Sequence, residues 1–310
     1  MIERDTALVL GGTGFVGTHI VASLRNSGYR TISVSRAMSP NGAEHVSLDL
    51  GTDDPRPLTD LLRRYRPAVV VNAAGSYWGL DERRMYHSLV TLTETTLAAL
   101  AAHPDLRTRY VHLGSVLEYG PLPTSGQVDE SAPTQPESLY GRMKLAATMV
   151  VQAAIAHGAV DGVVLRVTNS IGPGVHPGTL IGRVGSILAG HRAGRARIEL
   201  SSLAAYRDFI DVRDLGDAVL AAAQSRPLHT VVNIGRGQAV SVRQLVDRLV
   251  TISAVPADVV ESATAPSALG ANASWLEVAT DTAEQALGWR VTRDVDQALR
   301  DYWSTLVSPI

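Results

Sequence analysis

A glycine-rich segment, Gly11-Gly-Thr-Gly-Phe-Val-Gly17, directly follows the apolar stretch Ala7-Leu-Val-Leu10. Gly11 permits a tight turn, Gly14 lets the backbone approach a ligand closely, and Gly17 allows a helix to pack closely against a strand. A turn of this kind between a buried strand and a helix is typical of a dinucleotide site, because the helix N-terminus attracts the pyrophosphate. The spacing Gly-x-x-Gly-x-x-Gly differs from the commoner Gly-x-Gly-x-x-Gly, and a purely structural turn is the weaker interpretation.

Strand and helix patterns alternate along the chain. They predict strands at residues 7–10, 31–35, 45–48, 68–72, 110–113, 162–165 and 230–234. They predict helices at residues 15–26, 58–65, 88–102, 140–157, 215–224, 242–251 and 295–305. This alternation indicates an α/β fold built on a doubly wound parallel sheet of the Rossmann type.

The regular alternation weakens after Asn169, where glycine and proline between residues 172 and 178 indicate loops. We expect a smaller C-terminal substrate domain, partly interleaved with the sheet. The predicted dinucleotide-binding domain comprises residues 1–168 and 210–236, and the predicted substrate domain comprises residues 169–209 and 237–310. Loops at 76–80 and 174–207 are expected to close over the substrate.

The composition excludes several classes of protein. The 310 residues carry a formal charge of −2, which gives no electrostatic case for nucleic acid or an anionic membrane as the main partner. Because there is no cysteine, disulfides, thiolate zinc sites and cysteine nucleophiles are excluded, and we expect no metal site. No apolar run is long enough to span a bilayer, and the N-terminal Met-Ile-Glu-Arg-Asp is unlike a secretory signal. We therefore expect a cytoplasmic protein.

A tyrosine and a lysine, Tyr140 and Lys144, stand four residues apart in a predicted helix. Residues at this spacing share one helix face. The ordinary tyrosine pKa of about 10 is too high for efficient proton exchange at neutral pH, and a neighbouring ammonium lowers it. The same ammonium suits a hydrogen bond to a nicotinamide ribose. Alone, the pair would be an ordinary helix-surface pair. Downstream of the glycine-rich segment, it indicates a nicotinamide-dependent oxidoreductase.

Ser115 stands at the end of the strand predicted at 110–113. In a doubly wound sheet the carboxyl ends of the strands face the ligand crevice. A hydroxyl there donates to a carbonyl oxygen and polarises it. The alternative is an ordinary strand-end serine, and only the presence of Tyr140 and Lys144 favours the catalytic interpretation.

The end of the second strand indicates which nicotinamide cofactor fits. An acid there would bind the ribose 2′-hydroxyl of NAD, whereas this chain has Ser35 and Arg36. A guanidinium suits a 2′-phosphate, so NADP(H) is favoured over NAD(H), with a solvated surface arginine as the alternative. Asp49 and Leu50, after the third strand, are placed to meet the adenine, although an ordinary loop aspartate is equally consistent.

These segments resemble the extended short-chain dehydrogenase/reductase family, the nucleotide-sugar epimerases, dehydratases and reductases. The resemblance covers most of the chain and rests on residues 11–17, 72–75, 115–120, 140–144, 165–173, 207–211, 233–235 and 287–289. It implies that Tyr140 is the general acid/base, that Lys144 is its electrostatic and ribose-binding partner, and that Ser115 is the carbonyl donor.

The resemblance also implies binding residues. The implied contacts to the nucleotide-sugar diphosphate are Asn169 and Arg207, with a loop-capping asparagine and a surface arginine as the alternatives. The implied cofactor contacts are Gly11, Gly14, Phe15, Val16, Gly17, Arg36, Asp49, Leu50, Ala73, Ala74, Gly75, Tyr140 and Lys144.

The two residues after Ser115 narrow the implied reaction. The dehydratase branch of the family carries an Asp-Glu pair there, whereas this chain has Val116 and Leu117. Apolar side chains cannot protonate a leaving hydroxyl, so 4,6-dehydration is disfavoured. The fucose-synthase branch epimerises beside a ketone with a cysteine at the position of Leu117, so that chemistry is unsupported as well. The asparagine that often opens a helix near Leu89 in this family is absent here.

Two redox reactions remain that need only the serine, tyrosine, lysine and a nicotinamide. One is net reduction of a ketosugar, and the other is C4 epimerisation by transient oxidation. Reduction consumes NADPH, which Arg36 favours, so we expect an NADPH-dependent ketoreductase acting on a nucleotide-linked sugar. By resemblance the substrate is a dTDP-4-keto-6-deoxyhexose of deoxysugar biosynthesis for antibiotic and other natural-product glycosylation. A nucleotide-sensing binding protein on the same fold is a minor alternative, because such proteins often lose the tyrosine or lysine.

The predicted helices 88–102 and 140–157 carry alanine, leucine and valine over several faces. A sheet covering one face and a partner covering another would suit the helix-bundle homodimer that is common in this family. Two well-buried helices in a monomer are the alternative that the sequence leaves open.

Overall fold

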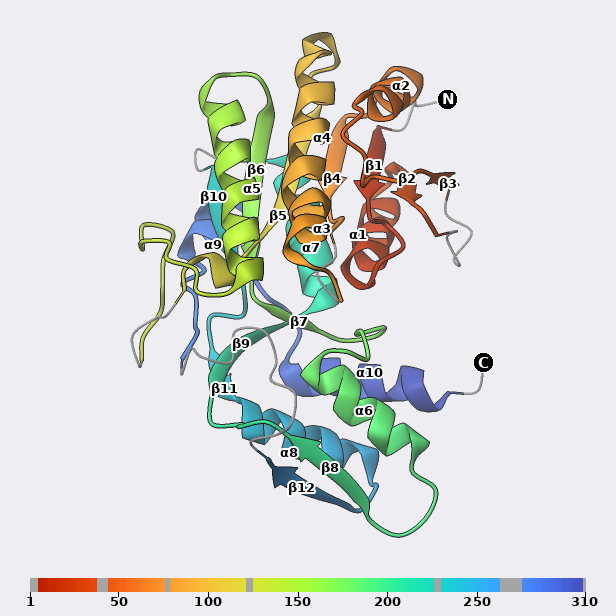
Figure 1. Ribbon diagram of the computed structural model, residues 1–310, viewed down its shortest axis with the longest axis vertical. Coiled ribbons are helices and arrows are strands. Elements are labelled where there is room, and N and C mark those ends of the chain that lie inside the picture. The colour runs from red at the N-terminus through yellow and green to blue at the C-terminus, as the bar shows by residue number, and fades with distance from the viewer. Residues whose placement is uncertain are drawn as a thin grey trace.

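The computed structural model describes residues 5–37, 44–75, 79–120, 125–225, 230–262 and 275–308. Seven parallel strands form the sheet of its larger lobe, in the order β10-β6-β5-β4-β1-β2-β3 (Figure 1). These strands are β1 (Thr6–Leu10), β2 (Arg30–Ser35), β3 (Glu44–Ser47), β4 (Val69–Asn72), β5 (Arg109–Ser115), β6 (Asp161–Val167) and β10 (Val231–Ile234). The predicted doubly wound α/β fold is therefore confirmed.

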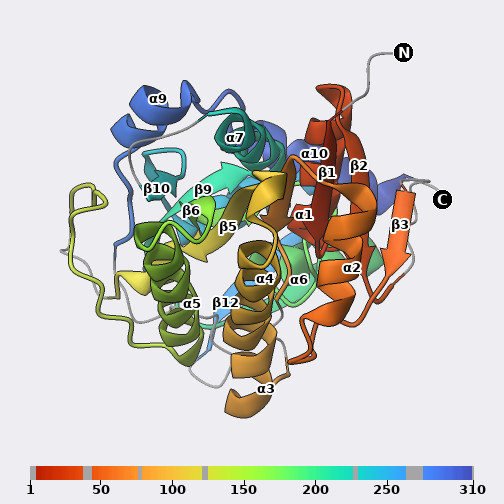
Figure 2. The same ribbon diagram turned by 90° about the horizontal axis from the view of Figure 1, so that it is seen from above.

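Helices cover both faces of this sheet (Figure 2). One face is covered by α1 (Phe15–Asn26), α7 (Val212–Gln224) and α9 (Asp281–Leu287). The other face is covered by α2 (Arg56–Tyr65), α4 (Leu92–Ala101) and α5 (Leu139–Ala156). Strands covered on both faces read as continuous apolar runs rather than alternating patterns, and β1 and β4 are buried at every residue.

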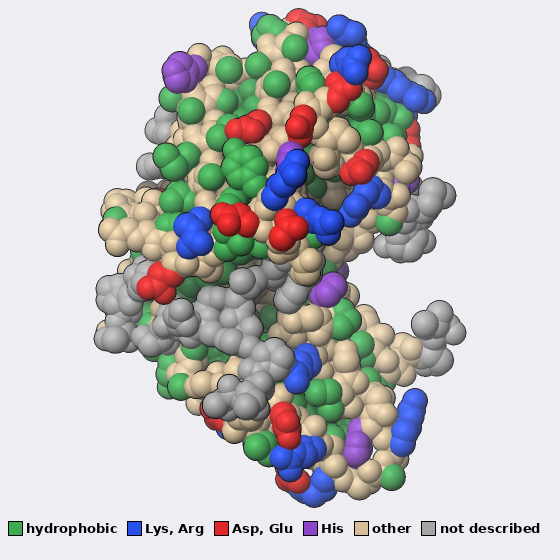
Figure 3. Space-filling view, viewed as in Figure 1, with side chains coloured by type: hydrophobic (Ala, Val, Ile, Leu, Met, Phe, Trp, Pro, Cys, Tyr) green, Lys and Arg blue, Asp and Glu red, His purple; other side chains and the backbone are tan. Residues whose placement is uncertain are grey.

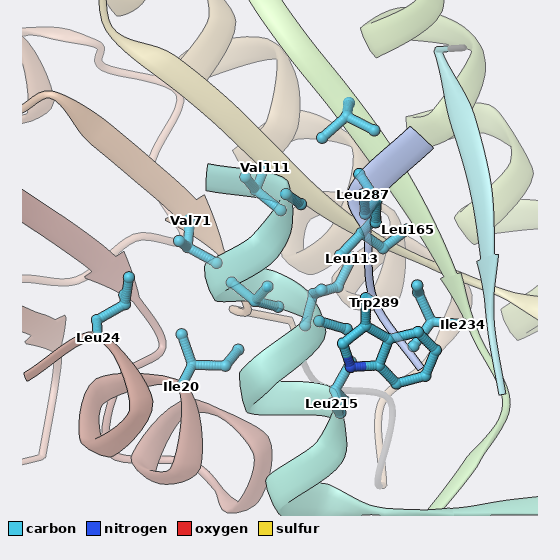
Figure 4. Packing of buried hydrophobic residues seen from close by; sticks show 14 of the residues in the cluster. Ile20, Leu24, Val71, Val111, Leu113, Leu165, Leu215, Ile234, Leu287 and Trp289 are labelled. Atoms are coloured by element: carbon cyan, nitrogen blue, oxygen red, sulfur yellow. The ribbon is translucent and has the colours of Figure 1, made fainter. Parts of the chain in front are cut away.

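The core on the α1 side ties the start of the chain to its end. Ile20 and Leu24 of α1 and Leu215 of α7 belong to one cluster with Leu287 and Trp289, which lie near the end of the sequence (Figure 4). Each fully buried side chain of this kind contributes about 1.5–3 kcal/mol. The cluster therefore holds α1, whose first turn borders the glycine-rich segment, firmly against the sheet.

A smaller lobe lies beyond the carboxyl ends of the parallel strands (Figure 1). Its helices are α6 (Leu180–Gly190), α8 (Val242–Ser253) and α10 (Val295–Val307). Its strands form a three-stranded sheet in the order β11-β9-β7 and a two-stranded sheet of β12 and β8. These strands are β7 (Asn169–Ile171), β8 (Ala196–Leu200), β9 (Tyr206–Asp211), β11 (Ala239–Ser241) and β12 (Ala257–Glu261). A separate apolar cluster holds this lobe together.

The stretch 174–207, expected to form loops, contains α6 and β8 instead. Glycine disfavours a helix, and α6 includes Gly182, Gly185 and Gly190. Two of these glycines are needed for packing, because a Cβ at Gly182 would overlap the His176 carbonyl and one at Gly185 would overlap the Tyr302 ring. The sequence patterns also predict none of β7, β9, β11, β12 and α9. Of the other expected loop, residues 76–78 lie outside the described residues.

The helix predicted at 88–102 is the second part of a longer helical run. This run consists of α3 (Glu82–Tyr86), a π-helix (His87–Thr91) and α4. Leu89, where the family often has asparagine, is buried within the π-helix and packs against the end of β4, since a Cβ on Gly75 would lie 2.5 Å from its Cδ2. Leu89 thus supports the loop after β4 by apolar contact.

The division into a dinucleotide-binding and a substrate domain stays a prediction. The packing joins the two predicted units, because α9 and Trp289 lie in the core of the larger lobe although they follow α8 in sequence.

None of the described helices combines the length and the apolar character needed to cross a bilayer.

Candidate active site

The glycine-rich segment forms the predicted turn between β1 and α1. Gly11 has a φ of +77°, and a Cβ there would lie 2.7 Å from the Cα of Ala74 and 2.8 Å from the carbonyl oxygen of Ala73. A Cβ on Gly17 would overlap the carbonyl oxygen of Gly11. Any larger residue at either position would therefore strain the turn or push it away from the end of β4.

The first turn of α1 has the features of an anion site. Gly14 is its N-cap, and no side chain caps its first amide groups. A Cβ on Gly14 would approach only the Gly11 carbonyl oxygen, at 3.3 Å. Phe15 and Val16 direct their side chains into the apolar clusters of the smaller and larger lobes. The backbone amides of this turn thus fit a pyrophosphate, which the helix dipole favours.

The ends of β1 and β4 lie side by side. The Ala73 amide donates to the Leu10 carbonyl oxygen at 3.0 Å, and the Ala74 amide donates to Asn72 Oδ1 at 3.2 Å. Gly75 follows with a φ of +125°, which favours glycine. The predicted cofactor residues 73–75 therefore line the same sheet edge as the glycine-rich turn.

The strand β2 ends at Ser35 and is followed by Arg36. Ser35 Oγ lies 2.8 Å from Thr13 Oγ1, which ties β2 to the glycine-rich turn. Arg36 is exposed, and its guanidinium forms no ion pair with any residue that the structure describes. Beyond β3, the exposed Asp49 carboxylate accepts from the Gly51 amide at 3.0 Å, and Leu50 packs at the edge of the α2-side core. At the end of β2 itself, the side chains of Ser35 and Arg36 are hydrogen-bond donors, and neither is an acid.

Ser115 ends β5 and caps a short 3₁₀ helix, η3 (Val116–Glu118). The side chain is 7% exposed. Its Oγ accepts from the Leu117 amide at 3.2 Å, so the hydroxyl hydrogen stays available as a donor. A serine held in this way at a strand end has the geometry expected of a carbonyl donor.

The first turn of α5 packs directly against η3. Ser138 caps α5, with its Oγ accepting from the Gly141 amide at 3.0 Å. A Cβ on Gly141 would lie 2.5 Å from the carbonyl oxygen of Leu117, so this close approach requires glycine. Tyr140, the neighbour of Gly141, is thereby placed beside the turn that follows Ser115.

Lys144 lies on the same helix face as Tyr140, as the spacing predicts. Its Nζ is 5.9 Å from the centroid of the Tyr140 ring and donates to the Leu113 carbonyl oxygen at 2.8 Å. Leu113 is two residues before Ser115 on β5. The structure therefore brings Ser115, Tyr140 and Lys144 together at the carboxyl end of this strand; their catalytic roles stay a prediction.

The electrostatics of Lys144 are unusual. Burial lowers the pKa of its amine to about 8, while the charge of Glu118 acts in the opposite direction. Lys144 is also the only lysine in a chain with 27 arginines. A lysine is a compact point charge whose pKa shifts readily towards neutral pH on burial, whereas an arginine stays charged, so the one lysine in the chain is itself a signal of function. The sequence predictions above do not use that signal.

Glu118 is a second feature of the site that the sequence predictions miss. Its side chain is fully buried. The Ser115 amide donates to Oε1 at 2.7 Å, and Arg166 Nε donates to Oε2 at 2.9 Å. The pattern Ser-x-x-Glu at 115–118 is a capping-box signature and could have revealed the first of these contacts.

The two predicted substrate residues lie on neighbouring strands of the smaller lobe. Asn169 on β7 donates through Nδ2 to the Asp208 carbonyl oxygen at 3.1 Å. Arg207 on β9 donates through Nη1 to the Tyr206 carbonyl oxygen at 2.8 Å, and burial lowers the pKa of its guanidinium. A buried guanidinium gains from an anionic ligand, which is consistent with a diphosphate contact. That contact stays a prediction.

Known proteins resemble this chain along nearly its whole length. The model of a family described as the NAD dependent epimerase/dehydratase family matches residues 7–235. A dTDP-6-deoxy-L-talose 4-dehydrogenase (NAD(P)(+)) from Kitasatospora kifunensis is 41% identical over 300 residues, which cover 96% of this chain and 94% of that protein. A UDP-glucose 4-epimerase from Rhizobium leguminosarum bv. trifolii is 26% identical, with 96% of each chain covered. The structure of RMD from Pseudomonas aeruginosa complexed with NADPH superposes with a TM-score of 0.82 at 25% identity, covering 98% of both chains.

Proposed function

Because the chain belongs to the NAD-dependent epimerase/dehydratase family and is an NAD(P)-dependent oxidoreductase, we propose that it reduces the C4 ketone of a nucleotide-linked sugar. The observation that carries this proposal is the placement of Ser115, Tyr140 and Lys144 at the end of β5. The reaction needs one proton donor, one carbonyl donor and one cation, and these residues supply one of each.

Each of the three residues has a distinct part in the reduction. When bound, a dihydronicotinamide supplies the hydride that adds to the carbonyl carbon. Tyr140 gives its phenolic proton to the carbonyl oxygen, so that the ketone becomes an alcohol. Ser115 donates its hydroxyl hydrogen to the same oxygen and polarises the carbonyl. The Lys144 ammonium stabilises the phenolate that remains on Tyr140 until a proton from solvent restores it.

The turn after Ser115 argues against dehydration of the sugar. Val116 is buried and Leu117 is half-buried, and neither side chain carries a proton to give. Glu118, the acid of this turn, is fully buried and paired with Arg166. With no proton donor on this turn besides Ser115, loss of a hydroxyl is unsupported and simple hydride transfer is favoured.

NADPH is the proposed cofactor. Arg36 is exposed and forms no ion pair with the described residues, and Ser35 stands where an acid would select NAD. The relative from Kitasatospora kifunensis is named for both cofactors, and the structure of RMD holds NADPH. The proposal is therefore a preference for NADPH rather than exclusion of NADH.

The proposed substrate is a dTDP-4-keto-6-deoxyhexose, an intermediate of deoxysugar biosynthesis for glycosylated natural products such as antibiotics. A 4-dehydrogenase of dTDP-6-deoxy-L-talose is 41% identical to this chain, and such an oxidation at C4 is the reverse of ketone reduction. Asn169 and Arg207 of the smaller lobe are the proposed diphosphate contacts. We further propose that the substrate domain comprises residues 169–209 and 237–310.

A homodimer through α4 and α5 is also part of the proposal. In the space-filling view, hydrophobic side chains gather on the larger lobe where α5 faces the viewer (Figure 3). Met149 on α5 is 59% exposed, and a groove runs beside it along Arg142, Leu145 and Ala146. A second copy packed on this face would cover these side chains. Sedimentation analysis of the purified protein tests it, and a monomer at micromolar concentration refutes this interface.

The reaction itself is tested by mixing the protein with NADPH and dTDP-4-keto-6-deoxyhexoses. We expect the absorbance of the reduced cofactor to fall in step with formation of the alcohol. Tyr140→Phe should abolish turnover while NADPH affinity stays close to that of the unmodified protein, because the substitution removes only the proton donor. Loss of NADPH binding in this variant would show that Tyr140 has a different role.

Other outcomes identify the alternative functions. Interconversion of UDP-sugars without consumption of added cofactor, and no reduction of any ketosugar, would replace the reductase with a C4 epimerase. Binding of NADPH and a nucleotide without turnover of either would favour a sensing protein.

A further inference from the structure

A buried network of polar side chains lies directly behind Ser115. At its centre is the Glu118 carboxylate, fully removed from solvent. One oxygen, Oε1, accepts from the Ser115 amide at 2.7 Å and from the Thr148 hydroxyl at 3.0 Å. The other, Oε2, accepts from Arg166 Nε at 2.9 Å. Three donors around one carboxylate are the pattern of an ionised group held in a single orientation.

The network extends away from the site and is anchored on other strands. The Arg166 guanidinium of β6 lies over the Tyr119 ring at 4.6 Å from its centroid. The Tyr119 hydroxyl donates to Asn233 Oδ1 of β10 at 2.8 Å. Glu118 is therefore held through the two outermost strands on this side of the sheet. Every side chain in this network is buried, so the Glu118 carboxylate has a fixed position.

A buried ion pair of this kind is a weak source of stability. Removing two charges from water offsets most of their attraction, and apolar replacements of similar volume often serve equally well. A contribution to stability alone therefore does not explain why residue 118 is a glutamate rather than an apolar residue. Its position behind Ser115, on the turn that α5 approaches, suggests a role in the reaction instead.

We propose that Glu118 is a positioning residue of the active site, which fixes the Ser115 backbone and supplies the counter-charge that keeps Lys144 an ammonium. This inference rests on the proposed function of the serine, tyrosine and lysine. Thr148 and Lys144 stand four apart on α5, so a carboxylate that bonds Thr148 lies one helical turn from the lysine. The same side chain thus acts on two of the three reacting groups.

The titratable groups around Lys144 show in which direction Glu118 changes the pKa of its amine. On its own helix, Tyr140 is the titratable neighbour. From β5, His112 is fully buried, and burial together with the charge of Lys144 lowers its pKa, so it stays neutral at pH 7 and gives no compensating charge. From η3, Glu118 acts to raise the Lys144 pKa against the effect of burial. On the described elements, Glu118 is the negative group that acts on this lysine.

The sole lysine of the chain allows a direct test in the intact protein. Incorporation of lysine labelled with ¹³C at Cε gives a single side-chain NMR signal, whose shift with pH reports the Lys144 pKa. We expect a titration midpoint at about 8 in the unmodified protein. Glu118→Gln keeps the shape and one acceptor oxygen but removes the charge, so the midpoint should fall by about one pH unit. An unchanged midpoint would overturn the proposal.

Two variants separate charge from general damage. Thr148→Val removes a hydrogen bond to Glu118 without removing charge, and its midpoint should stay close to that of the unmodified protein. Asp214→Asn neutralises another buried carboxylate that pairs with an arginine, Arg293, away from Lys144. Its midpoint should also stay unchanged, and an equal fall in this variant would refute a specific role for Glu118.

Glu118→Gln leaves the buried Arg166 guanidinium without its ion-pair partner, which can prevent folding. A double variant provides the test in that case. Glu118→Gln with Arg166→Gln removes both charges, and the midpoint should again lie below that of the unmodified protein because Glu118 is the member that acts on Lys144. A folded double variant with a normal midpoint would overturn the proposal.

Kinetics supply the second readout. The alkaline limb of kcat against pH should move to lower pH in Glu118→Gln by about the same interval as the lysine titration, with activity recovered most fully at low pH. A loss of kcat that is equal at every pH would mean that Glu118 is only structural. The titration needs no substrate, so a shifted midpoint in a protein that reduces no ketosugar refutes the proposed reaction and leaves only the effect of Glu118 on the charge of Lys144.

Discussion

The contact between Gly141 and the turn after Ser115 makes a strong prediction. A Cβ on Gly141 would lie 2.5 Å from the Leu117 carbonyl oxygen and 3.0 Å from the Pro136 side chain. Gly141→Ala therefore forces α5 and η3 apart by about 0.9 Å, because ordinary contact begins at 3.4 Å. Tyr140 is the preceding residue and must move with the helix, while Ser115 stays with β5.

Gly141→Ala should lower both the stability of the protein and the rate of the reaction. Overpacking of a close interface destabilises a protein by about 1–3 kcal/mol. A displacement near 1 Å between reacting groups lowers the rate by about 100-fold, which corresponds to about 2.7 kcal/mol of activation free energy. We therefore expect the variant to fold with a reduced midpoint in urea, and kcat to fall on the order of 100-fold. Affinity for NADPH should change much less than kcat, because the glycine-rich turn that is proposed to hold the pyrophosphate keeps its position although Tyr140 and Lys144 move with α5.

Gly190→Ala is the matched control. Gly190 ends α6, and a Cβ there would meet nothing within 4 Å. This variant should keep its kcat and should be as stable as the unmodified protein or slightly more so, since alanine favours a helix. If Gly141→Ala retained the full kcat, the close approach of α5 to η3 would not be what positions Tyr140, and the reasoning would be wrong.

Three further predictions concern the cofactor, the pH profile and stability. Arg36→Ala should lower the ratio of kcat/KM with NADPH to that with NADH by about ten- to a hundredfold, because a charge-assisted hydrogen bond contributes about 1.5–3 kcal/mol; an unchanged ratio would reject Arg36 as the discriminator. The rate of ketone reduction should decrease as the pH rises through about 8, where Lys144 loses its proton, and a flat profile to pH 9.5 would contradict this. Burial raises the pKa of Asp208 from 3.8 to about 6, so between these values the folded state retains a proton that the unfolded chain has lost. Stability should therefore decrease by about 2 kcal/mol from this residue as the pH rises from 4 to 6, and urea unfolding at both pH values should show a smaller decrease in Asp208→Asn.

The larger lobe could be predicted from the sequence because its signals are local. The strands of a covered parallel sheet are short apolar runs, and α1 has the predicted bounds, Phe15–Asn26. The glycine turn and the Tyr140–Lys144 spacing are likewise local patterns, so the sequence located the elements that position the site. The family and the doubly wound fold follow from the same patterns and are confirmed.

The smaller lobe and the interior of the site depend on contacts between distant residues. Gly182 and Gly185 disfavour α6 locally, yet they are required where α6 meets His176 and Tyr302. Glu118 is an acid in a turn, which ordinarily indicates exposure. Its partner Arg166 is 48 residues away in sequence, and no local pattern joins the two.

The return of the chain to the larger lobe has a consequence for synthesis on the ribosome. Leu287 and Trp289 pack against Leu215 and the strands of the larger sheet, so the half that carries the glycine-rich turn is completed by almost the last residues translated. The nascent chain cannot close this half until most of the smaller one has been translated, and the last helix of the smaller half, α10, follows directly. A premature stop near residue 280 would remove none of the proposed cofactor contacts, yet the truncated product should fail to bind NADPH and become a substrate for quality-control proteases.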